Sequence, residues 1–118
     1  MHLTLQFDTD NIDWQTLADI YAKAKFEGRT PEVLQADFEA ADVVCFGFDN
    51  TTLTAAVRIL GGKMYDFCVK SHCLGYGPAL VMYEYASKRA KVANPLIVAA
   101  EGVERQLIEK AELAEHLA

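Results

Sequence analysis

The spacing of apolar residues divides this chain into extended and helical segments. Alternating or continuously apolar stretches are typical of strands. The predicted strands are residues 2–8, 42–49, 51–60, 63–70 and 96–100. Apolar residues at three- and four-residue spacings are typical of amphipathic helices. The predicted helices are residues 12–25, 30–40, 78–91 and 101–118. This order predicts one mixed sheet of the α/β class with helices on both faces.

Capping residues mark where two of these helices begin. Thr30 followed by Pro31 predicts a helix start, because threonine caps helices and proline suits the first helical position. For the helix over residues 12–25, either Asp10 or Asn11 is expected to be the cap.

The three middle strands are predicted to form an antiparallel meander. The pairs Asp49-Asn50 and Gly61-Gly62 suit the two hairpin turns. Strict alternation in the third strand assigns its six central residues to two faces. It places Tyr65, Phe67 and Val69 on one face, and Met64, Asp66 and Cys68 on the other.

A β-α-β unit is predicted to follow the meander. The strand over 63–70 leads through the helix over 78–91 to the strand over 96–100. Such a crossover makes its two strands parallel. The last strand is continuously apolar, as expected of a strand that is covered on both faces.

Composition narrows the class of protein. The 118 residues predict a single domain over residues 1–118, and 52% hydrophobic residues can form a core. A formal net charge of −6 argues against nucleic acid as a partner, and no apolar run is long enough to span a membrane. Three cysteines without Cys-x-x-Cys spacing, and the absence of a signal-peptide pattern, predict a cytoplasmic protein with reduced thiols.

The loop between the third strand and the third helix is the strongest candidate for a binding site. Gly75 and Gly77 allow positive φ or a close approach of the backbone, and Pro78 is expected to open the helix. A glycine loop that leads into a helix N-terminus is suited to bind an anion such as phosphate. Four basic residues and one acidic residue near it in sequence support this interpretation: Lys70, Lys88, Arg89, Lys91 and Glu84.

The order of elements and this loop resemble the GNAT N-acetyltransferase superfamily over most of the chain. That family carries the motif Gln/Arg-x-x-Gly-x-Gly/Ala between its fourth strand and third helix. A gap-free alignment puts its signature positions at Leu74, Gly77 and Ala79. An alternative with a two-residue deletion puts them at His72, Gly75 and Gly77.

The first predicted helix also looks like that of small family members, in its Ile-Asp-Trp-x-x-Leu-x-x-Ile-Tyr opening at residues 12–21. The resemblance implies a GNAT-like sheet, with an antiparallel meander and one parallel strand, that lacks the C-terminal hairpin. It also implies acetyl-CoA as the acyl donor. In this resemblance, the backbone of the strand over 63–70 would bind pantetheine, and the glycine loop after it would bind pyrophosphate. The implied cofactor residues are Phe67, Cys68, Val69, Leu74, Gly75, Tyr76, Gly77, Pro78 and Ala79.

Acetyl transfer needs a base for the attacking amine and an acid for the departing thiolate. Candidates near the predicted cleft are His72, Asp66, Tyr76 and Glu101. His72 is favoured by its ordinary pKa, which is near neutrality. Residues 101–118 lack the tyrosine that the family often places there, and no residues have the spacing of a metal site.

Two functions fit these features. The first is an N-acyltransferase that transfers an acetyl group to a small-molecule or protein amine. The alternative is a non-catalytic, degenerate GNAT domain that binds CoA, another ligand or a partner protein. Without the hairpin, the strand over 96–100 would have a free apolar edge, which either the last helix or a second chain covers. We therefore expect a homodimer.

Overall fold

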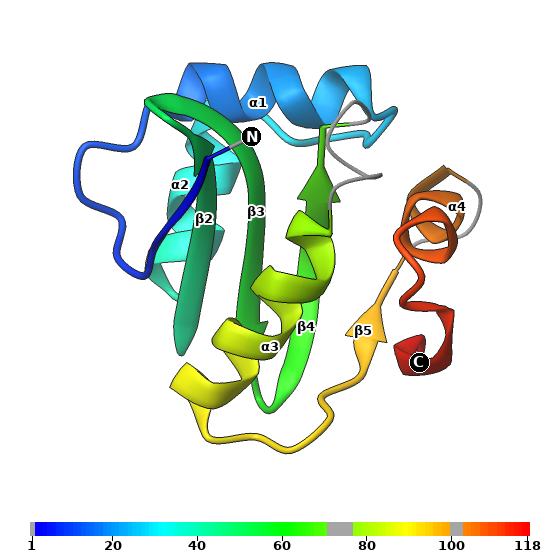
Figure 1. Ribbon diagram of the computed structural model, residues 1–118. Coiled ribbons are helices and arrows are strands. Elements are labelled where there is room, and N and C mark those ends of the chain that lie inside the picture. The colour runs from blue at the N-terminus through cyan, green and yellow to red at the C-terminus, as the bar shows by residue number, and fades with distance from the viewer. Residues whose placement is uncertain (1, 71–76, 100–102) are drawn as a thin grey trace.

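The computed structural model describes residues 2–70, 77–99 and 103–118 of the chain. Its strands are β1 (Leu3–Gln6), β2 (Val43–Asp49), β3 (Thr52–Leu60), β4 (Lys63–Val69) and β5 (Ile97–Val98). Its helices are α1 (Trp14–Lys23), α2 (Pro31–Glu39), α3 (Pro78–Ala90), α4 (Val103–Lys110) and a 3₁₀ helix, Ala114–His116. The sheet order is β1-β2-β3-β4-β5, and β4 with β5 is its parallel pair (Figure 1). The predicted mixed α/β sheet is confirmed.

Two predicted helix starts have different outcomes. Thr30 caps α2, since its hydroxyl accepts a hydrogen bond from the Val33 N–H at 3.2 Å, as predicted. The expectation of Asp10 or Asn11 as the cap of α1 is wrong. Asp13 is the cap instead, because its carboxylate accepts a hydrogen bond from the Thr16 N–H at 3.1 Å.

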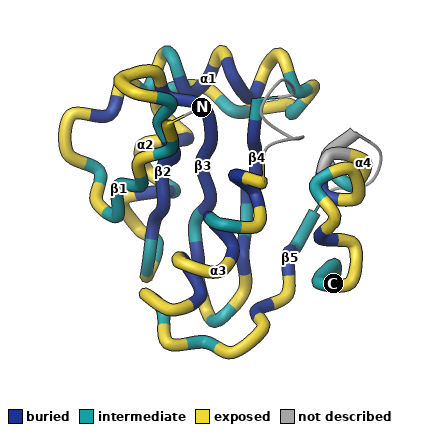
Figure 2. Tube along the Cα trace, in the orientation of Figure 1, coloured by how far each residue is buried: buried dark blue, intermediate teal, exposed yellow. Residues whose placement is uncertain are grey.

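Apolar side chains form one core on each face of the sheet. One core lies between the sheet and α3 with the C-terminal region, and contains Cys45, Val57, Met82, Ile97 and Ile108. The other lies between the sheet and α1 with α2, and contains Leu17, Tyr21, Leu34, Phe38 and Phe46. Figure 2 shows that most residues along the central strands β2, β3 and β4 are buried. The sheet is therefore the middle layer of three.

A β-bulge in β4 corrects the predicted alternation of that strand. Tyr65 lies opposite Arg58 and Cys68 lies opposite Ala56, so two residues of β4 face one residue of β3. Asp66 occupies the bulge with a φ of +54°. The extra residue shifts the side-chain parity by one. Three side chains therefore share the α3-side core, instead of the predicted set: Met64, Phe67 and Val69.

The outer edge of β5 is covered by the chain's own C-terminal residues. Leu117 forms a parallel bridge with Ile97, and the Ala118 N–H donates to the Ile97 carbonyl at 3.0 Å. The His116 ring stacks on Tyr83, whose hydroxyl lies 2.9 Å from His116 Nδ1. The predicted helix over 101–118 is shorter than expected, because α4 ends at Lys110. The edge of β5 at Ile97 is therefore covered by the C-terminal residues of the same chain. A second chain is not needed to cover it there.

None of the helices within the described residues is long and apolar enough to cross a membrane.

Candidate functional site

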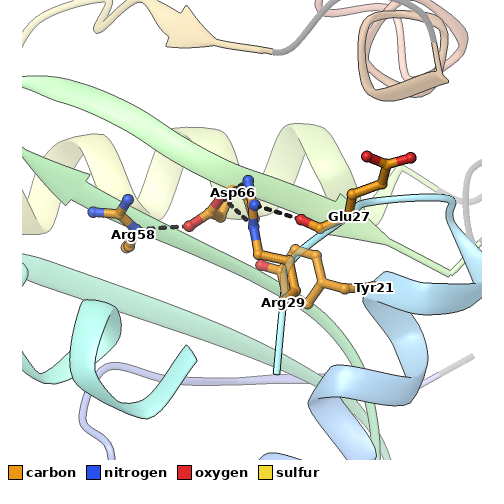
Figure 3. A network of polar contacts seen from close by, with 5 residues as sticks. All are labelled: Tyr21, Glu27, Arg29, Arg58 and Asp66. Atoms are coloured by element: carbon orange, nitrogen blue, oxygen red, sulfur yellow. Dashed lines mark hydrogen bonds and ion pairs between the residues drawn. The ribbon is translucent and has the colours of Figure 1, made fainter. Parts of the chain in front are cut away.

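A cluster of charged side chains lies at the bulge of β4 (Figure 3). The Asp66 carboxylate has only 6% of its side-chain surface exposed. Its Oδ1 accepts hydrogen bonds from Arg29 Nε at 3.0 Å and Nη2 at 2.7 Å. Its Oδ2 accepts one from Arg58 Nε at 2.8 Å. The loop between α1 and α2 and strand β3 thus hold one buried carboxylate between two guanidinium groups.

The backbone of the bulge is held by α1. The Tyr21 hydroxyl donates a hydrogen bond to the Asp66 carbonyl. Arg29 is anchored at its other end, where Nη1 donates to the Glu27 carbonyl at 2.9 Å. A non-glycine residue in the left-handed region costs conformational energy, so surrounding contacts must hold it there. Tyr21, Arg29 and Arg58 supply those contacts to Asp66.

Strands β4 and β5 part immediately before the bulge. Their pairing comprises Met64 with Ile97 and Tyr65 with Val98. From Asp66 onward, no strand among the described residues pairs with the β5-facing side of β4. This side of the strand has the backbone edge that an extended ligand can pair with.

The expected pantetheine-contacting residues Phe67, Cys68 and Val69 lie along this part of β4. These whole residues, backbone included, are at most 3% exposed, and their side chains belong to the two cores. A ligand beside β4 could therefore not contact these side chains, and the contact that the resemblance implies is through the backbone.

The N-terminus of α3 has no side-chain cap. Gly77 is the N-cap residue with a φ of +78°, and no side chain of a described residue caps this end of the helix. A Cβ added at Gly77 would meet nothing within 4 Å, so space is open beside it. Pro78 is the first helical residue, as predicted, and Ala79 is buried. Free N–H groups and the positive end of the helix dipole make this end suitable for an anion.

The basic residues near this loop in sequence are not near it in space. Lys88 and Arg89 lie in the last turn of α3, and Lys91 is its C-cap residue. A 13-residue helix is about 20 Å long, so these charges lie at its far end. The expected basic surrounding of the loop is therefore wrong for these three residues. Lys70, directly after β4, remains near the start of the loop in sequence.

Several predicted site residues lie outside the described part of the chain. They are His72, Leu74, Gly75, Tyr76 and Glu101. The choice between Leu74 and His72 as the first signature position therefore stays open. Of the catalytic candidates, the structure places Asp66. Because two arginines bind both of its carboxylate oxygens, its geometry favours a positioning role over proton transfer.

Sequence reasoning missed Tyr21, Arg29 and Arg58. The Gly61-Gly62 turn fixes the hairpin, and counting back from it places Arg58 opposite Tyr65, beside Asp66. That signal could have identified one of the two ion pairs. Arg29 is 37 residues from Asp66 in a loop, and no local pattern connects them.

The side chains of Cys45 and Cys68 are both buried. Burial raises the pKa of the Cys45 thiol to about 12, because a thiolate would be desolvated there. Within residues 2–70, 77–99 and 103–118, no three His, Cys, Asp or Glu side chains gather as metal ligands would.

No family model and no curated protein matches the sequence. Solved structures do resemble the chain. SA2161 from meticillin-resistant Staphylococcus aureus, a probable acetyltransferase, is 15% identical with a TM-score of 0.66, over 81% of this chain and 77% of that one. SP0256 from Streptococcus pneumoniae TIGR4, an acetyltransferase of the GNAT family, is 17% identical with a TM-score of 0.65, over 89% and 80%. The chain therefore has a GNAT fold, in agreement with the resemblance of its sequence.

Proposed function

We propose that this protein is an acyl-CoA-dependent N-acyltransferase that transfers an acetyl group from acetyl-CoA to an amine. The observation that carries the proposal is the combination of two backbone features at one end of the sheet. Within the described part of the chain, β4 has no β5 partner from Asp66 onward, and α3, whose N-cap residue Gly77 has no side chain, begins at Pro78. The first fits an extended pantetheine arm and the second fits a pyrophosphate.

The described residues fit acetyl-CoA in chemical type. Backbone groups of Phe67, Cys68 and Val69 would pair with the amides of the pantetheine arm, while the first turn of α3 after Gly77 would hold phosphate oxygens. Bound acetyl-CoA supplies an activated thioester. The protein's part is to hold the donor beside β4 and to admit an amine to it.

A non-catalytic GNAT domain is the second candidate. One observation favours it: residues 101–118 contain no tyrosine, so the thiol-protonating residue that the family often has there is missing. Such a domain would use the same edge of β4 to bind CoA, or would bind another ligand or a protein.

Calorimetric titration with acetyl-CoA and with free CoA tests the binding step, and CoA release with a panel of primary amines tests turnover. The enzyme proposal predicts binding together with amine-dependent CoA release. Binding without release from any amine favours the non-catalytic domain. No binding of either molecule at millimolar concentration would overturn both CoA-based functions.

A further inference from the structure

Arg58 has donor groups that the protein does not use. Its Nε donates to Asp66 Oδ2, but neither of its Nη nitrogens has a hydrogen-bond partner among the described residues. Arg29 differs, because its Nε, Nη1 and Nη2 all donate to protein oxygens. Figure 3 shows the Nη end of Arg58 directed away from Asp66.

This guanidinium is well buried for a group with free donors. Only 15% of the Arg58 side chain is exposed. No fully buried side-chain nitrogen or oxygen among the described residues lacks a partner, so the free Nη nitrogens lie at accessible surface. Charged groups with so little exposure are usually paired and hydrogen-bonded. An anion from solvent can contact the accessible Nη nitrogens of Arg58, while most of the Arg58 side chain is shielded from water.

The orientation of this group is fixed on two sides. Asp66 holds Nε, and the Tyr65 ring centroid lies 5.0 Å from Arg58 Cζ. The free edge of the planar guanidinium presents parallel N–H groups, which match the two oxygens of a carboxylate or phosphate. The charge balance agrees, because Arg29 and Arg58 share the single carboxylate of Asp66.

The surface around this edge is open and partly apolar. Leu60 is next to Ile59, and Leu96 and Val98 flank Ile97. Ile59 and Ile97 belong to the α3-side core, so their neighbours point to the opposite face, which is also the face of Arg58. Leu60 and Leu96 are 41% and 44% exposed, and Val98 is half-buried.

This face also adjoins the place where an acyl donor would lie. Arg58 is opposite Tyr65, the last residue of β4 that pairs with β5, and it binds the Asp66 side chain at the bulge. A molecule held at the Arg58 edge would thus lie beside the proposed thioester position, on the face that α3 does not cover.

We propose that the Nη edge of Arg58 binds an oxyanion of the acyl acceptor, so that the acceptor is an amine that carries a carboxylate or a phosphate. This inference rests on the proposed acyltransferase function. One positive charge remains where Arg29 and Arg58 share the Asp66 carboxylate, and it favours an oxyanion on the acceptor although the net charge of the protein is −6.

A binding measurement tests the site without turnover. N-acetylphenylalanine and inorganic phosphate are titrated into the full chain, into Arg58→Gln and into Arg58→Lys, by two-dimensional NMR. We expect one of the two probes to shift backbone amide resonances of β3 and β4 near Arg58 and Tyr65, with an affinity that falls tenfold or more in Arg58→Gln and less in Arg58→Lys, which keeps the charge. Arg89→Gln is the matched control, because Arg89 lies at the C-terminal end of α3, and it should leave the affinity unchanged.

Turnover distinguishes the sources of the oxyanion. CoA release is compared between phenylalanine and phenylalaninamide, and between phosphoethanolamine and ethanolamine. A preference of at least tenfold for the member that carries a carboxylate or a phosphate, lost in Arg58→Gln through a higher KM, supports the inference and names the anion. Equal rates within both pairs overturn it while leaving the acyltransferase function standing.

Two further outcomes are decisive. If Arg58→Gln fails to fold, Arg58→Lys carries the test, because it retains a cation for Asp66 but loses the planar fork; unchanged probe affinity in this variant overturns the inference. If acetyl-CoA does not bind, the proposed function fails. The NMR titration still decides whether Arg58 binds an oxyanion, and no shift with either probe counts against it.

Discussion

The Tyr21 hydroxyl on α1 donates a hydrogen bond to the carbonyl of Asp66, the residue at which β4 bulges and parts from β5. Helix α1 thereby provides a partner for a backbone carbonyl at the point where strand pairing stops. A buried carbonyl without a partner costs free energy, so this contact stabilises the parted arrangement.

Removal of that hydroxyl tests its contribution. Tyr21→Phe keeps the ring in the α1-side core but leaves the Asp66 carbonyl without this donor. We expect a loss of about 1–3 kcal/mol in the free energy of unfolding, measured by urea denaturation. Tyr85→Phe is the control, because Tyr85 is 51% exposed and should change stability little. Equal stability of the two variants would contradict the role given to Tyr21.

The left-handed backbone of Asp66 predicts that a glycine substitution destabilises the protein less than an alanine substitution. Asp66→Ala removes the carboxylate from both arginines and should lower the free energy of unfolding by about 3 kcal/mol. Asp66→Gly removes the same interactions, but glycine adopts a φ of +54° without strain. The glycine variant should therefore be about 1 kcal/mol more stable than the alanine variant. Denaturation of both gives the difference, and an alanine variant at least as stable as the glycine variant would argue against the bulge.

The covered edge of β5 predicts the effect of shortening the chain. Deletion of residues 114–118 removes the Leu117 bridge, the Ala118 hydrogen bond and the His116 ring stacked on Tyr83. It should lower stability and increase self-association, measured by light scattering, because Ile97 would then lie on an open edge.

His116→Ala is the control for that deletion. It removes the stacked ring but keeps Leu117 and Ala118 over the edge, so it should not increase self-association. If the shortened chain self-associates no more than the full chain, residues 117 and 118 do not prevent association through the edge of β5. The same experiment on the full chain tests the expected homodimer.

The buried thiol of Cys45 predicts a pH dependence. Burial raises the pKa of this thiol to about 12, against 9.0 for an exposed thiol, so ionisation favours unfolding. The associated stability is fully present below pH 9 and is lost as the pH rises toward 12. At pH 10 the loss should be about 1.4 kcal/mol. Cys45→Ala should lose this component when urea denaturation is compared at pH 8 and pH 10, and an unchanged pH dependence would contradict it.

Element order was predictable because apolar periodicity and turn chemistry are local. Thr30 with Pro31, and Gly61 with Gly62, mark ends that the structure confirms. The bulge was not predictable in the same way. Nothing in residues 63–70 alone breaks the alternation, and Asp66 occupies the bulge because residues distant in sequence bind its side chain and carbonyl.

The basic residues expected around the glycine loop could not be placed correctly from sequence spacing either. Lys88, Arg89 and Lys91 follow the glycine loop closely in sequence, but a helix carries them to its other end. The sequence of β3 alone does not predict a site at Arg58. The free donors of Arg58 follow from the positions of its partners in space.

The most direct test of the central claim is the affinity for acetyl-CoA of two variants at Gly77. Both Gly77→Gln and Gly77→Glu place a side chain on a backbone with a φ of +78°, so they share the same strain and nearly the same size. They differ in charge at the N-terminus of α3. If this end binds phosphates, calorimetry should show acetyl-CoA binding at least tenfold weaker for Gly77→Glu than for Gly77→Gln. Equal affinities in the two variants would contradict a phosphate site there.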